Sequence, residues 1–405
     1  MAGRLPVVIS AATAVSFILS GSVGYARMEY HVVASGAVGA SDNPRSQPDQ
    51  SSNQADGFMA AEGQFDLRNA GRRTTERLGY SITATSWFRE IENPYVTQTL
   101  GLASEIKLGP ETSLTLSGGA TLTRLSMVDT SSLSDSQTGL RPAGNQYFLG
   151  IDASESLASQ LSAAWRVDQA LEGHWYRPWG DALTSAGNKS ASLRGALNHT
   201  WTRDWAGLQT RVGVATQDEQ AITSNSTSEF GELALSWQHE WTPDLRHTVA
   251  AGIAFLHVEE WHPMPAGSAS LLWNKNGRNA ELRASTGASA NYYTGVAYQQ
   301  SSVGLRVGLP IDRLERFRLA ASADLERGRT LASSTTQESA AEVAFLRASA
   351  AWAASETLAL SLQYTFRYQR AVTTESGTDS GAGAFPTLRQ QTIMLSVQVQ
   401  YPPPR

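Results

Sequence analysis

The sequence predicts an all-β fold: a transmembrane, antiparallel, up-and-down β-barrel of about eighteen strands. Three observations predict it. Apolar and polar residues alternate along the chain, the alternating segments are long, and tight turns alternate with long polar connections. Because successive side chains of a strand point to opposite faces, this alternation gives each strand one apolar face and one polar face. No segment sustains the i, i+3, i+4, i+7 spacing of an amphipathic helix.

The alternation is clearest near the end of the chain. In residues 358–368 every even position is Leu, Tyr or Phe, and in residues 392–401 the odd positions are Ile, Leu, Val, Val and Tyr. The predicted strands average about 14 residues, whereas strands of soluble sheets have about 5–6. A tilted strand needs about 9–11 residues to cross the hydrocarbon layer, so these segments can span a membrane. The pattern predicts strands at 28–41, 57–68, 76–90, 95–108, 112–126, 145–156, 159–173, 189–202, 204–217, 228–241, 245–258, 267–274, 278–288, 296–309, 314–327, 340–353, 356–370 and 388–401.

The connections between these segments differ in length in a regular way. Tight turns mostly follow the even-numbered strands, and Asn276-Gly277 is the residue pair that a two-residue hairpin prefers. Most odd-numbered strands are followed by long polar connections, of which 127–144 is the longest internal one and the best candidate for a plug in the lumen. Hairpin-linked strands leave two free edges unless the sheet closes. The sequence also allows sixteen strands, if the hairpin at 267–288 lies outside the membrane.

Composition excludes several classes of protein. Only 17% of the 405 residues are charged, against about 25% in an average soluble domain. A mean hydropathy of −0.27 excludes a polytopic helical membrane protein. The net charge of −5 is close to balance and gives no indication of a nucleic-acid partner. Because cysteine is absent, the chain has no disulfide, no thiolate metal site and no lipid anchor on cysteine.

The first residues have the pattern of a secretory signal peptide. Arg4 supplies the positive charge, residues 5–20 are apolar, and Gly24-Tyr25-Ala26 has the small-x-small pattern of a cleavage site. A membrane-anchoring helix is the alternative, but the apolar run is shorter than the roughly 20 residues that a span needs. We therefore expect a signal peptide at 1–26, the barrel at 27–401 and a periplasmic tail at 402–405.

Together, the export signal, the alternating strands and the apolar last strand ending in Tyr401 resemble a bacterial outer-membrane β-barrel. Members of this class usually end on an aromatic residue that the assembly machinery reads. Here Pro402, Pro403, Pro404 and Arg405 follow the aromatic residue, and proline cannot donate a ladder hydrogen bond. The resemblance implies an outer-membrane location, contact with outer-membrane lipid and no cofactor. Tryptophans near the turns are typical of an interfacial belt, the alternative being the core of a soluble sandwich: Trp201, Trp205, Trp237, Trp241, Trp273 and Trp352.

The polar face of the strands predicts which side chains line the lumen. A charge in a water-filled lumen costs little, whereas an arginine that faces lipid at the midplane costs about 2–4 kcal/mol. The lining forms either a conduit for a hydrophilic solute or a set of ion pairs that fills the lumen. The pore-lining candidates are Glu62, Asp66, Arg68, Arg89, Asp152, Arg166, Asp168, Arg194, Arg211, Arg283, Arg306 and Arg367, and the same parity adds Arg318 and Asp324.

Three aromatic residues share this inward parity: Trp87, Phe148 and Tyr298. Their rings could stack on sugars, or they could be ordinary packing residues of the lumen. The predicted architecture resembles the outer-membrane components of some exopolysaccharide export systems, which implies export of a polysaccharide with periplasmic and inner-membrane partner proteins. A general diffusion porin or a structural barrel is the alternative, and an outer-membrane enzyme is a third hypothesis.

The catalytic and metal-binding signals are weak. His257 and His262 lie close together near acidic residues, but their spacing is not that of the H-E-x-x-H motif, whose two histidines share a helical face. Ser and Asp occur throughout the chain, so no Ser-His-Asp set can be chosen, and the phosphate-binding and dinucleotide-binding glycine motifs are absent. We therefore expect no catalytic residues and no metal site.

Overall fold

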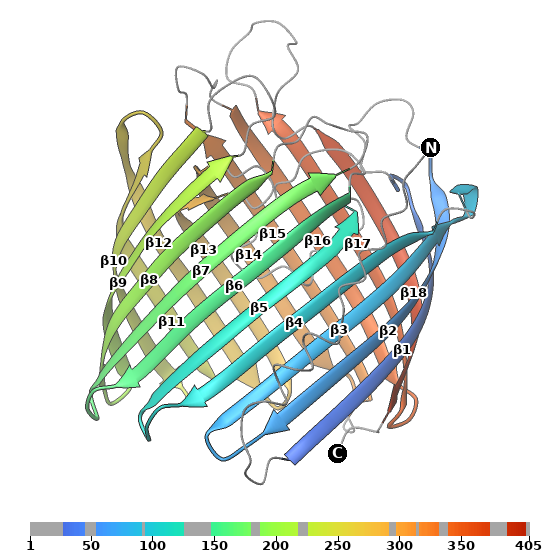
Figure 1. The fold of residues 1–405 in the computed structure, drawn as a ribbon, viewed down its shortest axis with the longest axis horizontal. Helices are drawn as coiled ribbons and strands as arrows, with labels where there is room; N and C mark the ends of the chain where they lie inside the picture. Colours follow the sequence, from blue (N-terminus) through green and yellow to red (C-terminus); the bar gives the residue numbers. More distant parts are fainter. Residues whose placement is uncertain are drawn as a thin grey trace, which may run out of the picture.

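The computed structural model describes residues 27–44, 54–90, 94–124, 147–179, 187–217, 226–290, 297–312, 316–331, 339–372 and 387–401. They form one 18-stranded antiparallel sheet (Figure 1). The predicted signal peptide 1–26, the predicted plug 127–144 and the tail 402–405 lie outside the described residues. The strands are β1 Arg27–Ser41, β2 Asp56–Ala70, β3 Thr74–Trp87, β4 Tyr95–Lys107, β5 Thr112–Arg124, β6 Tyr147–Gln160, β7 Trp165–Trp179, β8 Asn188–Trp201, β9 Asp204–Gln217, β10 Ser226–Thr242, β11 Leu245–His257, β12 Trp261–Lys275, β13 Arg278–Ala290, β14 Ala297–Pro310, β15 Phe317–Thr330, β16 Ser339–Ala353, β17 Leu358–Val372 and β18 Leu388–Tyr401.

The sheet closes on itself. Each strand pairs with the next in the chain, and β1 pairs with β18 from Val32 opposite Tyr401 to Ser41 opposite Thr392. The predicted fold class and the number of strands are therefore confirmed. Closure gives the first and last strands the partners that an open sheet would deny them. Within the described residues, no helix is long and apolar enough to cross a membrane.

The cross-strand pairs define an outer and an inner face of the wall. Val38, Leu395 and Leu362 lie directly opposite one another in one row, and 47–54% of each residue's surface is exposed. The adjacent row points the other way and contains Gln363 and Met394. Large exposed apolar side chains continue on the same face around the ring. Because hydrocarbon is the surrounding that favours such a surface, the chain is an outer-membrane protein.

The two ends of the barrel differ. Tight turns join the strands at one end, where Asn276 (φ 51°) and Gly277 (φ 75°) adopt the positive φ angles of a type I′ hairpin turn. The described chain also begins and ends there, since Arg27 starts β1 and Tyr401 ends β18 (Figure 1). We assign this end to the periplasm, because short turns mark the periplasmic end of such barrels. Exposed tryptophans gather near it: Trp165, Trp201, Trp237, Trp241 and Trp352. Trp205 instead lies opposite Thr200 and Gln238, on the inner face.

The largest differences from the predicted strand boundaries are at β7, which runs from Trp165 to Trp179 and not over 159–173, and at β12. The segment 159–173 was expected to be one strand, but β6 ends at Gln160 and β7 begins at Trp165. Ser162 makes the turn between them, since its hydroxyl accepts hydrogen bonds from the backbone N–H groups of Ala164 (3.3 Å) and Trp165 (3.2 Å). The strand expected at 267–274 begins at Trp261 instead. Its hairpin with β13 is part of the wall, so the count of sixteen strands is wrong.

The wall is split between β12 and β13 in its extracellular half. These strands pair only from Gly267 to Lys275 of β12, although the ladder between β11 and β12 continues without interruption to Trp261. Pro263 and Pro265 lie in the unpaired part. Since the ladder to β11 is unbroken, both proline nitrogens point away from β11, toward the side on which β13 would otherwise pair. Proline is tolerated at such an edge because no N–H is needed there.

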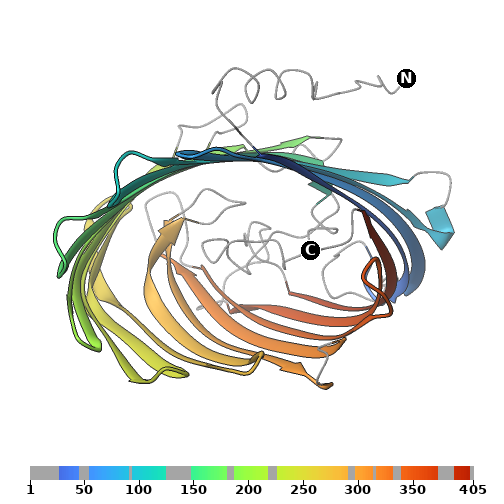
Figure 2. The same ribbon diagram turned by 90° about the horizontal axis from the view of Figure 1, so that it is seen from below.

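Beyond the split, the ends of β13 and β14 fold into the barrel. The backbone N–H of Ala297 donates to the Ser228 hydroxyl of β10 (3.1 Å). Ala288 and Ala297 pack in one buried cluster with apolar side chains from β10, β11 and β12, namely Phe230, Ala254, Leu256, Met264 and Ala266. Figure 2 shows the ends of these orange-yellow strands inside the ring. We call these ends of β13 and β14 the in-folded arm, and they narrow the lumen next to β10, β11 and β12.

Gly252 is required where β11 approaches the backbone of β10 closely. It faces the lumen from β11 opposite Ala234, and a Cβ at this position would lie 2.0 Å from the carbonyl oxygen of Leu233. We expect Gly252→Ala to lower the free energy of unfolding by about 1–3 kcal/mol, measured by urea titration of the folded barrel in vesicles. Gly101→Ala is the control, because its Cβ would meet no atom within 4 Å. Equal losses in the two variants would contradict the close approach.

Candidate functional site: the lumen

The register places the pore-lining candidates, except Arg89, on the inner face. They come from β2, β6, β7, β8, β9, β13, β14 and β17: Glu62, Asp66, Arg68, Asp152, Arg166, Asp168, Arg194, Arg211, Arg283, Arg306 and Arg367. Arg89 lies outside the strands, in the short 3-10 helix Phe88–Glu90. Its backbone N–H donates to Asp56 (3.3 Å) and its guanidinium donates to Gln54. Arg89 therefore belongs to the extracellular rim.

Three rows of the inner face carry only acidic charges, and we call them the acidic wall; the next row toward the periplasm carries Arg68 opposite Arg77. The acidic wall consists of three adjacent rows that run from β2 to β6, beginning at Glu62, Gln64 and Asp66. The last row starts at Asp66 and ends at Asp152, with Gly79, Gly101 and Gly119 between them. The other members of these rows are neutral: Thr83, Thr97, Thr123, Phe148, Ser81, Thr99, Thr121 and Gly150.

A second part of the inner face, which we call the basic wall, consists of two adjacent rows from β13 to β17. One row contains Arg283, Asp324 and Arg367, and the other contains Glu281, Arg306 and Arg347. Four arginines thus outnumber two acids there. Arg283 pairs with Asp324 (3.1 Å). The blue to green strands that carry the acidic wall and the orange strands that carry the basic wall lie on facing sides of the ring (Figure 2).

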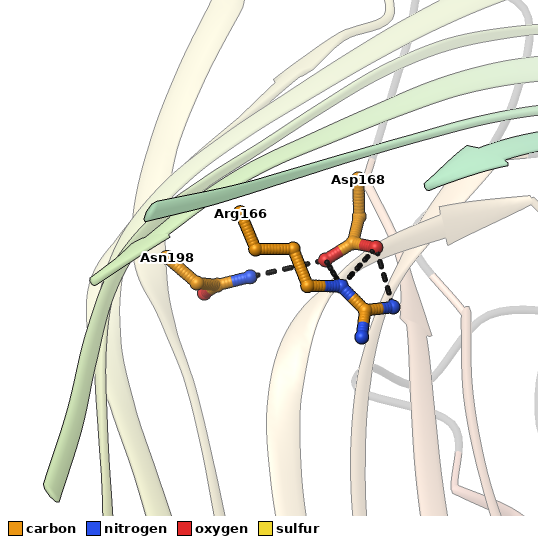
Figure 3. Close-up of polar contacts among 3 residues, drawn as sticks. All are labelled: Arg166, Asp168 and Asn198. Carbon is orange, nitrogen blue, oxygen red and sulfur yellow. Dashed lines mark hydrogen bonds and ion pairs between the residues drawn. The ribbon is translucent and has the colours of Figure 1, made fainter. Parts of the chain in front are cut away.

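A polar cluster lies near the periplasmic end of β7 and β8 (Figure 3). Arg166 and Asp168 are two residues apart on β7 and so share a face, and the Arg166 Nε donates to both carboxylate oxygens of Asp168 (2.8 and 3.1 Å). The Asn198 amide of β8 donates to the same carboxylate (3.2 Å). Both charged side chains are partly exposed. The cluster can offer a guanidinium edge to a passing anion while the carboxylate holds the arginine in place.

Two arginines lie side by side in the lumen, nearer the extracellular end than the cluster of Arg166, Asp168 and Asn198. Arg194 on β8 is directly opposite Arg211 on β9, and Glu232 on β10 is opposite Arg211 on its other side. The Arg211 guanidinium lies 5.2 Å from the centre of the Phe230 ring, a cation–π distance. Phe230 belongs to the cluster that holds the in-folded arm. This charged group is therefore positioned at the narrowed side of the lumen.

Asp152 of the acidic wall is hydrogen-bonded to a residue that the sequence did not single out. His174 lies opposite Asp152 on β7, and its Nδ1 is 2.7 Å from the Asp152 carboxylate. Arg347 was also missed, because both parities of the segment 340–353 are rich in Ala. Strand parity could have identified both residues, but their partners depend on the register between strands.

The three aromatic candidates lie on the inner face, near the extracellular end. Trp87, Phe148 and Tyr298 are buried to 6%, 2% and 1% exposure. The Trp87 ring contacts Phe58 and the Phe148 ring contacts Tyr176, each with 5.0 Å between ring centres. Tyr298 packs in a cluster of its own with Ala341 and Val343. In this structure the buried rings present no open face on which a sugar could stack.

His257 and His262 lie on different faces of the wall. His257 is opposite Trp261 with the outer parity, whereas His262 is opposite Leu256 with the inner parity. The His257 ring stacks near Trp261, with 4.9 Å between ring centres. Among the described residues, no group of three or more His, Cys, Asp or Glu side chains is arranged to hold a metal ion.

Comparison with known proteins gives matches among solved structures. No protein-family model matches the chain, and no curated protein sequence matches it. The siderophore receptor PirA from Pseudomonas aeruginosa is 11% identical, with a TM-score of 0.48 over 91% of this chain and 80% of the receptor. OpdQ from the same organism is 9% identical (TM-score 0.43; 92% and 98% covered). OccK2 (OpdF), solved in complex with glucuronate, is 9% identical (TM-score 0.48; 92% and 98% covered).

Proposed function

We propose that this protein is a passive outer-membrane channel for small hydrophilic solutes that carry charge. The observation that supports it best is the pairing of the acidic wall with the facing basic wall inside a closed barrel. Walls of opposite sign set up a field across the lumen, which orients a dipolar solute and supports ions of both signs. In a narrow lumen with low-dielectric walls such a field is focused rather than dispersed.

Polysaccharide export, the main expectation from the sequence, has less support. It relied on aromatic rings that could stack on sugars, and Trp87, Phe148 and Tyr298 are buried. The charged side chains of the two walls can be solvated by water and by a small solute, without a polysaccharide. We therefore favour the porin alternative, and we propose neither a catalytic role nor a dedicated periplasmic partner.

Conductance of the purified protein tests the proposal. The folded barrel, reconstituted alone in a planar bilayer with KCl, is expected to give stable ion-conducting steps, because a passive channel needs no partner. Heat-modifiable migration on a gel checks that the protein is folded. The absence of any conductance from folded protein would contradict the proposal. Deleting the gene separates the alternatives: loss of surface polysaccharide with unchanged uptake of small solutes would favour export.

A further inference from the structure

A groove with a volume of about 890 Å³ crosses the outer face of the barrel from β11 to β17. Its lining consists of two neighbouring rows of outward-facing residues, together with the row between them, whose side chains point inward. Two outward rows and a single inward row place the groove on the lipid-facing side of the wall. It is independent of the lumen and of the proposed channel.

The row nearer the extracellular end is polar and basic. Its members lie directly opposite one another from strand to strand: Arg370, Glu342, Arg327, Ser301, Thr286 and Gly267. Arg370 pairs with Glu342 (3.0 Å). Among the described residues, Arg327 has neither an ion-pair partner nor a hydrogen-bond partner for its side chain. Arg329 lies on the same face two positions further along β15. Among the described residues, two arginines and a single acid give this row a net positive charge.

The second row is apolar. It lies toward the membrane interior and contains Tyr368, Ala344, Leu325, Val303, Ala284, Ala269 and Val249. Small side chains in the middle of both rows, such as Ala284 and Ser301, make the floor of the groove low. The groove begins where the wall splits, since Gly267 opposite Thr286 is the last pair between β12 and β13. The in-folded arm sets β13 and β14 back from β12, which makes an otherwise convex wall concave.

The order of the two rows matches the layers of a membrane. An arginine facing lipid costs about 2–4 kcal/mol at the midplane but only about 0–1 kcal/mol near the interface. Arg327, Arg329 and Arg370 lie within a few residues of the extracellular ends of β15 and β17, so they belong at headgroup level. Guanidinium groups bind phosphate with two parallel hydrogen bonds. The apolar row below them lies at the depth of acyl chains.

We propose that this groove is a binding site for a phosphate-bearing glycolipid of the outer leaflet. Arg327 and Arg370 take the phosphate, and an acyl chain lies along the row from Tyr368 to Val249. The charge of the upper row favours an anionic lipid over an apolar protein segment, which would leave the unpaired Arg327 without a counter-charge. Such a site gives a role to arginines that lie on an otherwise apolar face of the barrel.

Lipid titration tests the proposal. Native mass spectrometry of the purified barrel in neutral detergent is expected to show saturable binding of diphosphoryl lipid A, and weakening by about tenfold or more in Arg327→Gln/Arg370→Gln. Ala284→Trp, which fills the groove without removing charge, is expected to weaken binding as well. Arg177→Gln is the control, because Arg177 lies on the outer face of β7, outside the groove. Heat-modifiable migration checks that each variant is folded.

Three outcomes would overturn the proposal. One is binding that is equal in the wild type, the double variant and the groove-filled variant. Another is equal binding of lipid A with and without its phosphates, which would leave the arginines without a role. The third is specific capture of a second copy of the chain through this face with no effect of lipid, which would make the groove a protein interface. None of these results bears on conductance, so the channel proposal is tested separately.

Discussion

Leu362→Arg is expected to prevent most of the protein from assembling, whereas Gln363→Arg, one residue further on, leaves assembly intact. Leu362 faces outward opposite Leu395, and Gln363 faces the lumen opposite Met394. An arginine on the lipid face costs about 2–4 kcal/mol near the midplane, which is a large share of the about 5–15 kcal/mol that stabilises a typical protein. In the lumen the same side chain stays hydrated.

The two variants are compared by folding each into lipid vesicles and measuring the fraction that migrates as the compact form without heating. A urea titration of the same samples gives the difference in free energy of unfolding. The adjacent positions share strand, depth and substitution, so only the face differs. Equal folded fractions would show that the assignment of the two faces is wrong.

Arg306→Glu combined with Arg347→Glu is expected to shift the ion selectivity of the channel toward cations. Both side chains lie in one row of the basic wall, on β14 and β16. At about 10 Å in water, a unit charge changes the energy of an ion by about 0.4 kcal/mol. Reversing two charges therefore changes the energy of each ion by about 1.7 kcal/mol, which screening over one Debye length in about 0.1 M salt reduces to about 0.6 kcal/mol. Because the change has opposite signs for K⁺ and Cl⁻, their permeability ratio shifts by about 1.2 kcal/mol, or roughly eightfold.

The reversal potential in a KCl gradient measures this ratio. Arg327→Glu combined with Arg370→Glu is the matched control, because it makes the same change in net charge on the outer face of the wall. The control is expected to leave the reversal potential unchanged. A shift of the same size in both double variants would mean that the lumen does not set the selectivity.

The sequence was sufficient for the fold because the rule for a strand is local. A period of two decides which side chains face lipid, and tight turns such as Asn276-Gly277 decide where strands end. The start of β7 was missed because the segment around Ala163 and Ala164 keeps the parity of a strand while Ser162 makes a turn. The predicted strand 267–274 left residues 261–266 in a connection, whereas in the structure they belong to β12, with Pro263 and Pro265 at its unpaired edge.

The candidate site was predictable only in part, since residue types follow from parity and partners follow from register. Parity places Asp66 and Asp152 on the inner face, but it does not show that they share one row across five strands. His174 becomes a partner of Asp152 only when β6 and β7 are aligned. The outer groove depends on the split between β12 and β13. The local sequence around Arg327 or Arg370 does not predict such a groove.

Closure of the barrel also constrains the order of events during synthesis. Asn43, just beyond β1, donates its side-chain N–H to the carbonyl of Arg389, 346 positions later in the chain (2.8 Å). The first strand therefore has no closing partner until the last strand has been made, and a pairing of such long range forms slowly. Strands that wait with open edges aggregate unless they are shielded. We therefore expect truncation before β18 to leave the whole chain, and not only its last hairpin, dependent on periplasmic chaperones and open to proteolysis.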